Sequence, residues 1–149
     1  MAEKIFAIID TNNIVTDDMV LDVDTEEEGV QQARDILNNQ TATVVETFSN
    51  ANDAATRYNF GGVGNTWDAT NNAFIEPQPF TSWSLDVNYK WQAPGTPYGD
   101  TSSISDDYYV VEWDENNLRW NALDTATETV TNYWDGSAWV DVVAQSPRG

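Results

Sequence analysis

The clearest structural pattern in the second half of this chain is Trp113-Asp114-Glu115-Asn116-Asn117-Leu118-Arg119-Trp120. Turn-forming Asp and Asn residues lie between two terminal tryptophans. If 115–118 form a loop between antiparallel strands, Trp113 lies opposite Trp120. Cross-strand aromatic pairs contribute roughly 0.2–1 kcal/mol each and hold the strands in register. The stretch therefore predicts a β-hairpin closed by two indole rings.

Three further segments repeat this pattern of an aromatic residue, a turn containing Asp with Asn or Gly, and a closing aromatic residue. The expected pairs are Trp67 with Phe74, Trp134 with Trp139 and, across a loop at 86–88, Trp83 with Trp91. All 7 Trp lie in this half of the chain. Residues 58–149 are therefore predicted to form a series of Trp-clasped antiparallel β-hairpins, in which most indole rings serve the fold.

The first half has a different pattern. An Ile-rich run predicts a buried strand, an alternating segment predicts a second, and Thr25 followed by Glu28 is typical of a helix N-terminus. Gly29 lowers the helix propensity slightly. The expected elements are strands at 4–9 and 14–23, a helix from 25 to about 38 and a strand at 41–48. Residues 1–50 are thus predicted to form a ββαβ unit with one amphipathic helix, residues 49–57 a connector, and the whole chain an α+β fold.

The amino-acid composition and the net charge exclude several classes of function. The 149 residues include 6 Lys+Arg against 25 Asp+Glu, a net charge of −19, and neither His nor Cys. This composition excludes disulfides, thiolate zinc sites and Ser-His triads. The negative charge disfavours nucleic acid and anionic membranes as partners. No targeting signal and no run of membrane-spanning length is present, so we expect a protein made and kept in a cytoplasm.

The chemistry-bearing residues predict no catalytic, cofactor or metal site. Carboxylate pairs are certain to occur by chance among so many acids, so they specify nothing. No Asp-x-Asp-x-Asp-Gly loop is present, which argues against a specific calcium site, although calcium binding stays an open alternative. Gly61-Gly62-Val63-Gly64 lacks the Lys-Ser/Thr of a phosphate loop and predicts a glycine bend. The rare cations Arg57 and Lys90 are expected to make local ion pairs.

The middle of the chain resembles a known family. Its ordered motifs are Tyr58-Asn59-Phe60-Gly61-Gly62-Val63-Gly64, Trp67-Asp68, Ala73-Phe74-Ile75-Glu76-Pro77-Gln78-Pro79-Phe80, Ser82-Trp83-Ser84-Leu85-Asp86, Trp91-Gln92-Ala93-Pro94 and Tyr109-Val110-Val111-Glu112-Trp113-Asp114-Glu115. Over residues 58–120 they resemble small acidic structural proteins of marine tailed phages, especially T4-like cyanophages. Gln78, where a basic residue is expected, and an extra hairpin from Tyr133 to Val143 depart from that pattern. The resemblance implies a virion component without known catalysis.

The Pro-containing segment is the predicted contact with partners. Proline favours extended backbone and does not fit a central strand, so residues 75–82 are expected to form an extended arm or edge segment. This arm either lies on a neighbouring subunit or crosses its own hairpins. The predicted partner-binding residues are Phe74, Ile75, Pro77, Pro79, Phe80 and Trp83.

The predicted function is a non-enzymatic accessory protein of a tailed-phage virion, assembled in the host cytoplasm. Its expected partners are other virion proteins of the capsid, neck or tail, and self-association stays open. Capsid decoration fits the acidic surface best, and a neck, tail or baseplate position is the next choice. The alternative is a carbohydrate-binding module whose exposed Trp rings stack on a host glycan. A third reading is a glycosidase that uses two carboxylates.

Overall fold

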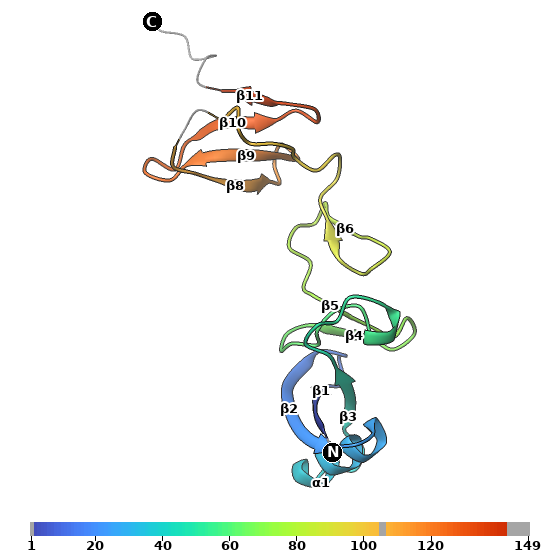
Figure 1. Ribbon diagram of the computed structural model, residues 1–149. Helices are drawn as coiled ribbons and strands as arrows, with labels where there is room; N and C mark the ends of the chain where they lie inside the picture. The colour runs from blue at the N-terminus through green and yellow to red at the C-terminus, as the bar shows by residue number, and fades with distance from the viewer. Residues whose placement is uncertain (1, 105–106, 143–149) are drawn as a thin grey trace, which may run out of the picture. The chain divides into compact units, whose positions relative to one another are not determined.

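The computed structural model describes residues 2–104 and 107–142. These residues form two compact units (Figure 1). Unit 1 takes the described residues up to Pro79 together with Leu85–Trp91, and unit 2 takes Phe80–Ser84 together with those from Gln92 onward. The boundary between the units therefore does not coincide with the change in composition near Tyr58. It passes through the small hairpin of β6 (Ser84–Leu85) and β7 (Trp91–Gln92).

Unit 1 confirms the predicted N-terminal ββαβ arrangement. Its main sheet has the strand order β2-β1-β3, and both pairings are antiparallel. A second, two-stranded sheet pairs β4 with β5. The elements are β1 (Ala2–Ile9), β2 (Val15–Val23), α1 (Glu26–Leu37), β3 (Thr43–Thr47), the 3-10 turn η1 (Ala54–Thr56), β4 (Thr66–Asp68) and β5 (Ala73–Ile75).

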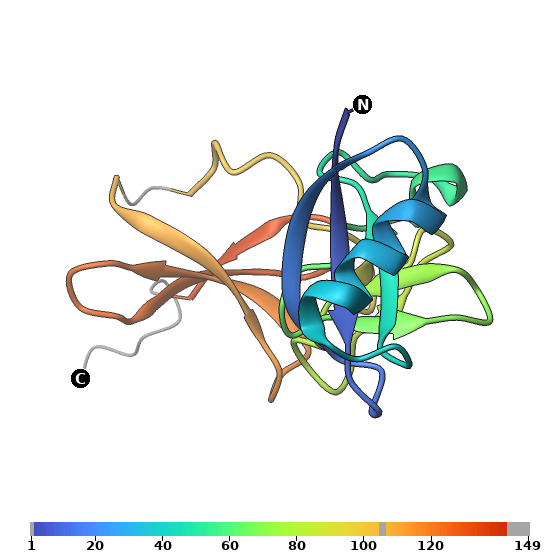
Figure 2. The same ribbon diagram turned by 90° about the horizontal axis from the view of Figure 1, so that it is seen from below.

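The main sheet of unit 1 is covered on both faces. Helix α1 packs on one face, and the β4–β5 hairpin packs on the other (Figures 1 and 2). Alternation along β1 supplies both cores, because Phe6 points to the helix and Ala7 to the hairpin. The helix side contains Phe6, Leu21, Val23, Ala33 and Val44, and the hairpin side contains Ala7, Ile9, Val15, Val45, Trp67 and Phe74.

Helix α1 begins as the sequence predicts. The Thr25 hydroxyl accepts a hydrogen bond from the Glu28 N–H at 3.2 Å. The Glu28 carboxylate accepts in turn from the N–H of Asp24, one residue before the cap. The helix ends at Asn38 in the left-handed conformation, with φ of 52°.

Gly29 has a packing role that helix propensity does not reveal. A Cβ atom at this position would overlap Cζ of the Phe6 ring. The ring of Phe6 is fully buried against the helix backbone at this point. Gly29 therefore sets how closely α1 approaches the sheet.

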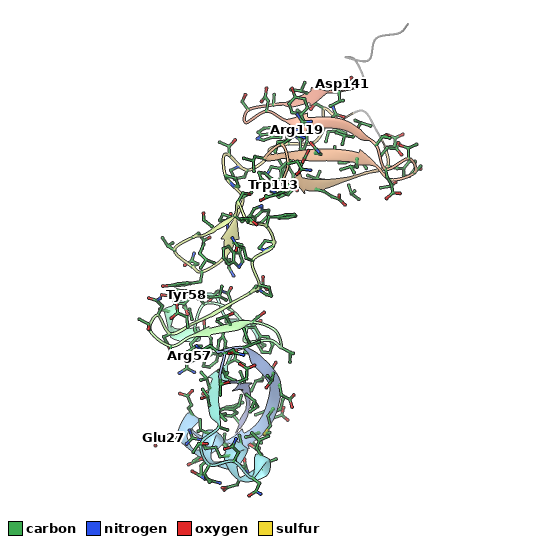
Figure 3. The ribbon with its side chains drawn as sticks, turned by 180° about the vertical axis from the view of Figure 1, so that it is seen from behind. Glu27, Arg57, Tyr58, Trp113, Arg119 and Asp141 are labelled. Carbon is green, nitrogen blue, oxygen red and sulfur yellow. The ribbon has the colours of Figure 1, made fainter. Side chains whose placement is uncertain are left out.

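A pair of charged residues covers the outer edge of β3. Arg57 forms a two-point ion pair with Glu26, with N–O distances of 2.8 and 3.2 Å. The Glu46 N–H donates to Glu26 at 2.9 Å, and the Glu46 carbonyl accepts from Arg57 at 2.6 Å. The pair thus satisfies both edge groups of Glu46, as a neighbouring strand would. The ion pair expected for Arg57 (labelled in Figure 3) is therefore confirmed. The other rare cation, Lys90, donates a hydrogen bond to the neutral side chain of Asn59 at 2.7 Å.

Unit 2 contains a four-stranded antiparallel sheet with the order β11-β10-β9-β8. Its strands are β8 (Tyr109–Asp114), β9 (Arg119–Asp124), β10 (Val130–Trp134) and β11 (Trp139–Asp141). The predicted pairs Trp113–Trp120 and Trp134–Trp139 are confirmed here, and Trp67–Phe74 is confirmed in unit 1. The extra C-terminal hairpin is present as β10 and β11, and its expected end at Val143 lies outside the described residues.

The predicted clasp between Trp83 and Trp91 is wrong. The Asp86 N–H donates to the Lys90 carbonyl at 2.9 Å, so the loop spans 87–89, one residue later than expected, and each residue of the first strand faces a partner two positions further along. Trp83 packs in unit 2 with other indole rings. Trp91 donates its indole N–H to the Glu76 carbonyl in unit 1. The Asp86 side chain, which accepts from the N–H groups of Asn88 and Lys90, stabilises the loop that is found.

Gly29→Ala tests the close approach of helix and sheet. Helix propensity alone predicts stabilisation by about 1 kcal/mol. We expect destabilisation by about 1–3 kcal/mol, because the new methyl group would overlap the Phe6 ring. Urea unfolding followed by circular dichroism measures the difference. Gly62→Ala is the matched control, since its Cβ would lie at an ordinary 3.5 Å from Phe60; equal stability of both variants would contradict the packing role.

Arg57→Met tests the edge pair. Partial burial of Glu26 opposes its ionisation, but hydrogen bonds from Arg57 and from the Glu46 N–H, with the attraction of Arg57 and Lys4, outweigh burial and lower the pKa. We expect a loss of about 1.5–3 kcal/mol at pH 7, because bonds to charged groups disappear. A lowered pKa contributes stability above the ordinary value of about 4.3 and loses it as pH falls through the folded-state value.

The stability difference between wild type and Arg57→Met should therefore shrink as pH falls below about 4.3 in urea titrations. Arg57→Lys keeps the charge without the two-point geometry and should lie between the two. A difference that is constant from pH 7 to pH 3 would contradict the ionic origin.

Candidate binding groove in unit 2

The register of the unit 2 sheet sorts its side chains onto two faces. Because Trp113 pairs with Trp120 and Trp134 with Trp139, these four indoles share one face. The opposite face carries the intervening positions, which are Asp114, Arg119, Asn121 and Tyr133. Near the hairpin turns one face of the sheet is therefore aromatic and the other mainly polar, while Val110 and Leu123 lie further along the second face.

The aromatic face forms a continuous series of ring contacts. Trp83 packs against Trp113 and Trp120 at centroid distances of 6.0 and 5.8 Å, and the last two lie 5.3 Å apart. Tyr98 lies between Trp120 and Trp139, at 5.2 and 5.6 Å. Most of these pairs are T-shaped, a favourable arrangement for ring quadrupoles. The series gives this small sheet a core without aliphatic layers.

A Pro-containing segment, residues 92–99, passes across these rings. The Trp134 indole N–H donates to the Thr96 hydroxyl at 3.3 Å, and that hydroxyl donates to the Gly136 carbonyl at 2.7 Å. The Trp139 indole N–H donates to the Gly99 carbonyl at 3.4 Å. The segment is thus tied to the β10–β11 hairpin by polar bonds as well as by Tyr98.

Carboxylates close the hairpin turns. Asp114 accepts from the side chain and the N–H of Asn117 and from the side chain of Asn121. The Asn117 side-chain bond is the main cause that holds the pKa of Asp114 below its ordinary value. Asp135 accepts from the N–H groups of Ser137 and Ala138, which lower its pKa likewise. These acids therefore stay ionised and serve as turn-forming residues.

Glu115 ties the turn of the first hairpin to the segment before β6. Its carboxylate accepts from the hydroxyl and the N–H of Ser82, at 2.6 and 2.9 Å, and from the Trp113 indole at 2.8 Å. The Ser82 hydroxyl bond, followed by the indole bond, lowers the pKa of Glu115. Trp83 is held in the ring series by this connection.

A groove of about 370 Å³ lies at the end of the sheet where both hairpin turns meet residues 94–96. Its walls combine indole and phenol rings with polar side chains of the two turns. The residues that line it are Pro94, Gly95, Thr96, Trp113, Asn117, Leu118, Arg119, Trp120, Tyr133, Trp134, Asp135 and Gly136.

Arg119 is the cation of this groove (labelled in Figure 3). Its guanidinium carbon lies 4.0 Å from the centre of the Tyr133 ring. Among the described residues, its only guanidinium hydrogen bond is from Nε to Asn121 Oδ1, at 3.1 Å. Asn121 is buried and also donates to Asp114. The Arg119 side chain is thus held at its stem, and its terminal N–H groups remain available as donors.

The predicted partner-binding residues are distributed over both units. Phe74 is 0% exposed inside unit 1, where its ring blocks any side chain at Gly61, so its ring is not available at a surface. Ile75 is half-buried at the end of β5. Phe80 and Trp83 are half-buried in unit 2, with ring centres 5.6 Å apart.

Pro77 and Pro79 are the exposed members of the predicted set. Residues 76–78 follow β5 without strand pairing, and residues 79–82 form a turn in which the Trp83 N–H donates to the Phe80 carbonyl. The part of the arm open to a partner is therefore residues 76–79.

The groove residues Arg119, Tyr133 and Thr96 were not predicted as functional. The hairpin register, read from the Trp pairs, places Arg119 opposite Asp114 and so suggests an ion pair instead. Among residues 2–104 and 107–142, no group of three or more potential acidic, His or Cys ligands gathers in metal-binding geometry. No helix in this part of the chain has the length and apolarity that would let it cross a membrane.

Comparisons of this chain with protein-family models, with curated proteins and with solved structures found no match.

Asp114→Asn tests the role of the turn carboxylates. The amide would place N–H donors against those of Asn117 and Asn121, and we expect a loss of about 1–2 kcal/mol at pH 7. The lowered pKa of Asp114 contributes stability above its ordinary value of about 3.9, and this contribution is lost as pH falls through the folded-state value. The difference from wild type should thus narrow below about pH 4.

Urea unfolding followed by Trp fluorescence measures this effect. Glu112→Gln, an exposed carboxylate of the same strand, is the matched control and should change stability by less than about 0.5 kcal/mol. Equal losses in both variants would show that general charge, and not the turn, is responsible.

Proposed function

We propose that this chain is a non-enzymatic accessory protein of a tailed-phage virion that binds other virion proteins. Its partners would be components of the capsid, neck or tail. The resemblance of residues 58–120 to small acidic phage structural proteins is the starting point of this proposal.

The observation that carries the proposal is the location of the residues behind that resemblance. Trp67 and Phe74 are buried in unit 1, and Trp113 is buried in unit 2. Asn59 is also buried and donates to the carbonyls of Phe74 and Tyr89. These residues of the motifs lie in the interior of the two units, which supports a shared fold, while other motif residues such as Pro77 and Pro79 are exposed.

The exposed arm supports a role in attachment. Residues 76–79 are exposed, and two of them are prolines that lack an N–H group. Such a segment costs little conformational entropy when it is held against a partner, because proline already restricts its backbone. We propose that Pro77 and Pro79 contact the neighbouring virion protein, while Phe80 and Trp83 anchor the following turn within unit 2.

A test measures incorporation into particles. The tagged chain is expressed during infection of a host by a phage that encodes it, and the ratio of the chain to the major capsid protein is determined in purified particles by quantitative mass spectrometry. We expect a constant ratio for the native chain and an about tenfold lower ratio for Pro77→Ser/Pro79→Ser, equivalent to about 1.4 kcal/mol of binding.

Val87→Ser is the matched control, because Val87 is 85% exposed and belongs to the β6–β7 loop. It should be incorporated like the native chain. Absence of the native chain from particles would overturn the proposed function. Normal incorporation of a folded arm variant would overturn the role of the arm alone.

A further inference from the structure

We infer that the groove of unit 2 binds a neutral hexopyranose unit of a glycan. This inference does not depend on the position of the chain in a virion. It assigns a ligand class and a place in the fold to the carbohydrate binding that the sequence suggested only in general.

The shape of the groove suits a small ring. Its volume of about 370 Å³ lies at the small end of the range for ligand sites. Hydrogen bonds from Trp134 to Thr96 and from Thr96 to Gly136 join two of its walls. Because these bonds exist before a ligand arrives, little ordering is required on binding.

The aromatic wall supplies the apolar contact. Trp120 and Trp134 both line the groove, and Trp134 lies at the turn of the last hairpin. The C–H face of a pyranose is apolar and flat, so it packs on an indole ring while its hydroxyls stay at the edge. Exposed Leu118, on the opposite turn, extends this apolar contact.

The polar wall offers both kinds of hydrogen-bonding partner. The terminal N–H groups of Arg119 form a planar set of donors that a pair of neighbouring hydroxyl oxygens can accept from. Asp135 uses Oδ1 for the turn, with bonds of 2.8 Å from two N–H groups, and no described residue donates to its Oδ2. Hydroxyls both donate and accept, so a neutral sugar satisfies Arg119 and Asp135 together.

Charge selects against an anionic ligand. Arg119 is the one cation among the groove residues, and Asp135 lines the same groove. The net charge of −19 adds repulsion within the screening length of about 8 Å at physiological salt. An anionic saccharide would be attracted by Arg119 but repelled by Asp135 and by the net charge, whereas a neutral saccharide meets no such repulsion.

A proline-rich peptide is the competing occupant. Such peptides need flat aromatic surfaces in a row. The chain's own residues 92–99 already cover the neighbouring rings, with Tyr98 between Trp120 and Trp139. The space that remains favours a single ring over an extended chain.

The test titrates the full chain with defined probes. The neutral probes are maltohexaose, cellohexaose, mannohexaose and chitohexaose, the anionic probe is hexaguluronate, and the peptide probe is decaproline. Trp fluorescence and saturation-transfer NMR report binding. We expect at least one neutral probe to bind, and hexaguluronate and decaproline to bind at least about tenfold more weakly.

Trp134→Ala and Trp139→Ala form the matched pair of variants. Both break the same cross-strand pair, but only Trp134 lines the groove. We expect Trp134→Ala to weaken binding of the neutral probe at least about tenfold, and Trp139→Ala to change it by less than about threefold. Near-UV circular dichroism checks the fold of each variant.

Arg119→Met keeps the inference testable if Trp134→Ala does not fold. Its methionine keeps an apolar stem near Tyr133 and removes the donors, and we expect an about tenfold loss of affinity. The inference is overturned if no neutral probe binds, if hexaguluronate or decaproline binds most tightly, or if folded Arg119→Met binds like wild type.

Discussion

Cross-strand packing of aromatic rings is the interaction on which unit 2 depends. A sheet of four short strands has little aliphatic interior of its own, and isolated hairpins are marginal in water. Two cross-strand pairs stabilise the sheet, Trp113 with Trp120 and Trp134 with Trp139. Each pair holds its own hairpin in register and also contributes rings to a shared series of aromatic contacts. Tyr98 joins the two pairs, so removal of one ring affects both hairpins.

The packing of unit 1 depends on a different feature, the close contact of phenylalanine rings with glycine residues. Phe6 packs against Gly29 of the helix, and Phe74 packs against Gly61 on the other side of the sheet. Aromatic rings fill both cores where an added methyl group would not fit. The Glu26–Arg57 pair then covers the β3 edge that would otherwise be open to another strand.

The two proposals use separate parts of the chain. The arm at 76–79 is exposed and contains two prolines, which disfavour strand pairing, and we propose that it contacts a protein partner. The groove lies where the two hairpin turns of unit 2 come to the same end of the sheet, and it is lined both by Arg119, which is held on Tyr133, and by Trp134. In these two proposals the chain attaches to a virion protein through the arm and binds a neutral glycan in the groove.

Three features could be predicted from the amino-acid sequence: the ββαβ order, the start of α1 at Thr25, and three of the four aromatic clasps. These features depend on residues a few positions apart, whose spacing sets the helix face or the hairpin register. The fourth clasp, Trp83 with Trp91, could not be derived in this way, because Asp86 shifts the loop by one residue and Trp83 joins rings 30 or more residues away. The unit boundary, the role of Gly29 and the partners of Arg57 became clear from the three-dimensional packing. It alone also decided that Arg119 lies on Tyr133 and not on Asp114, since these contacts join distant segments whose approach is set by packing.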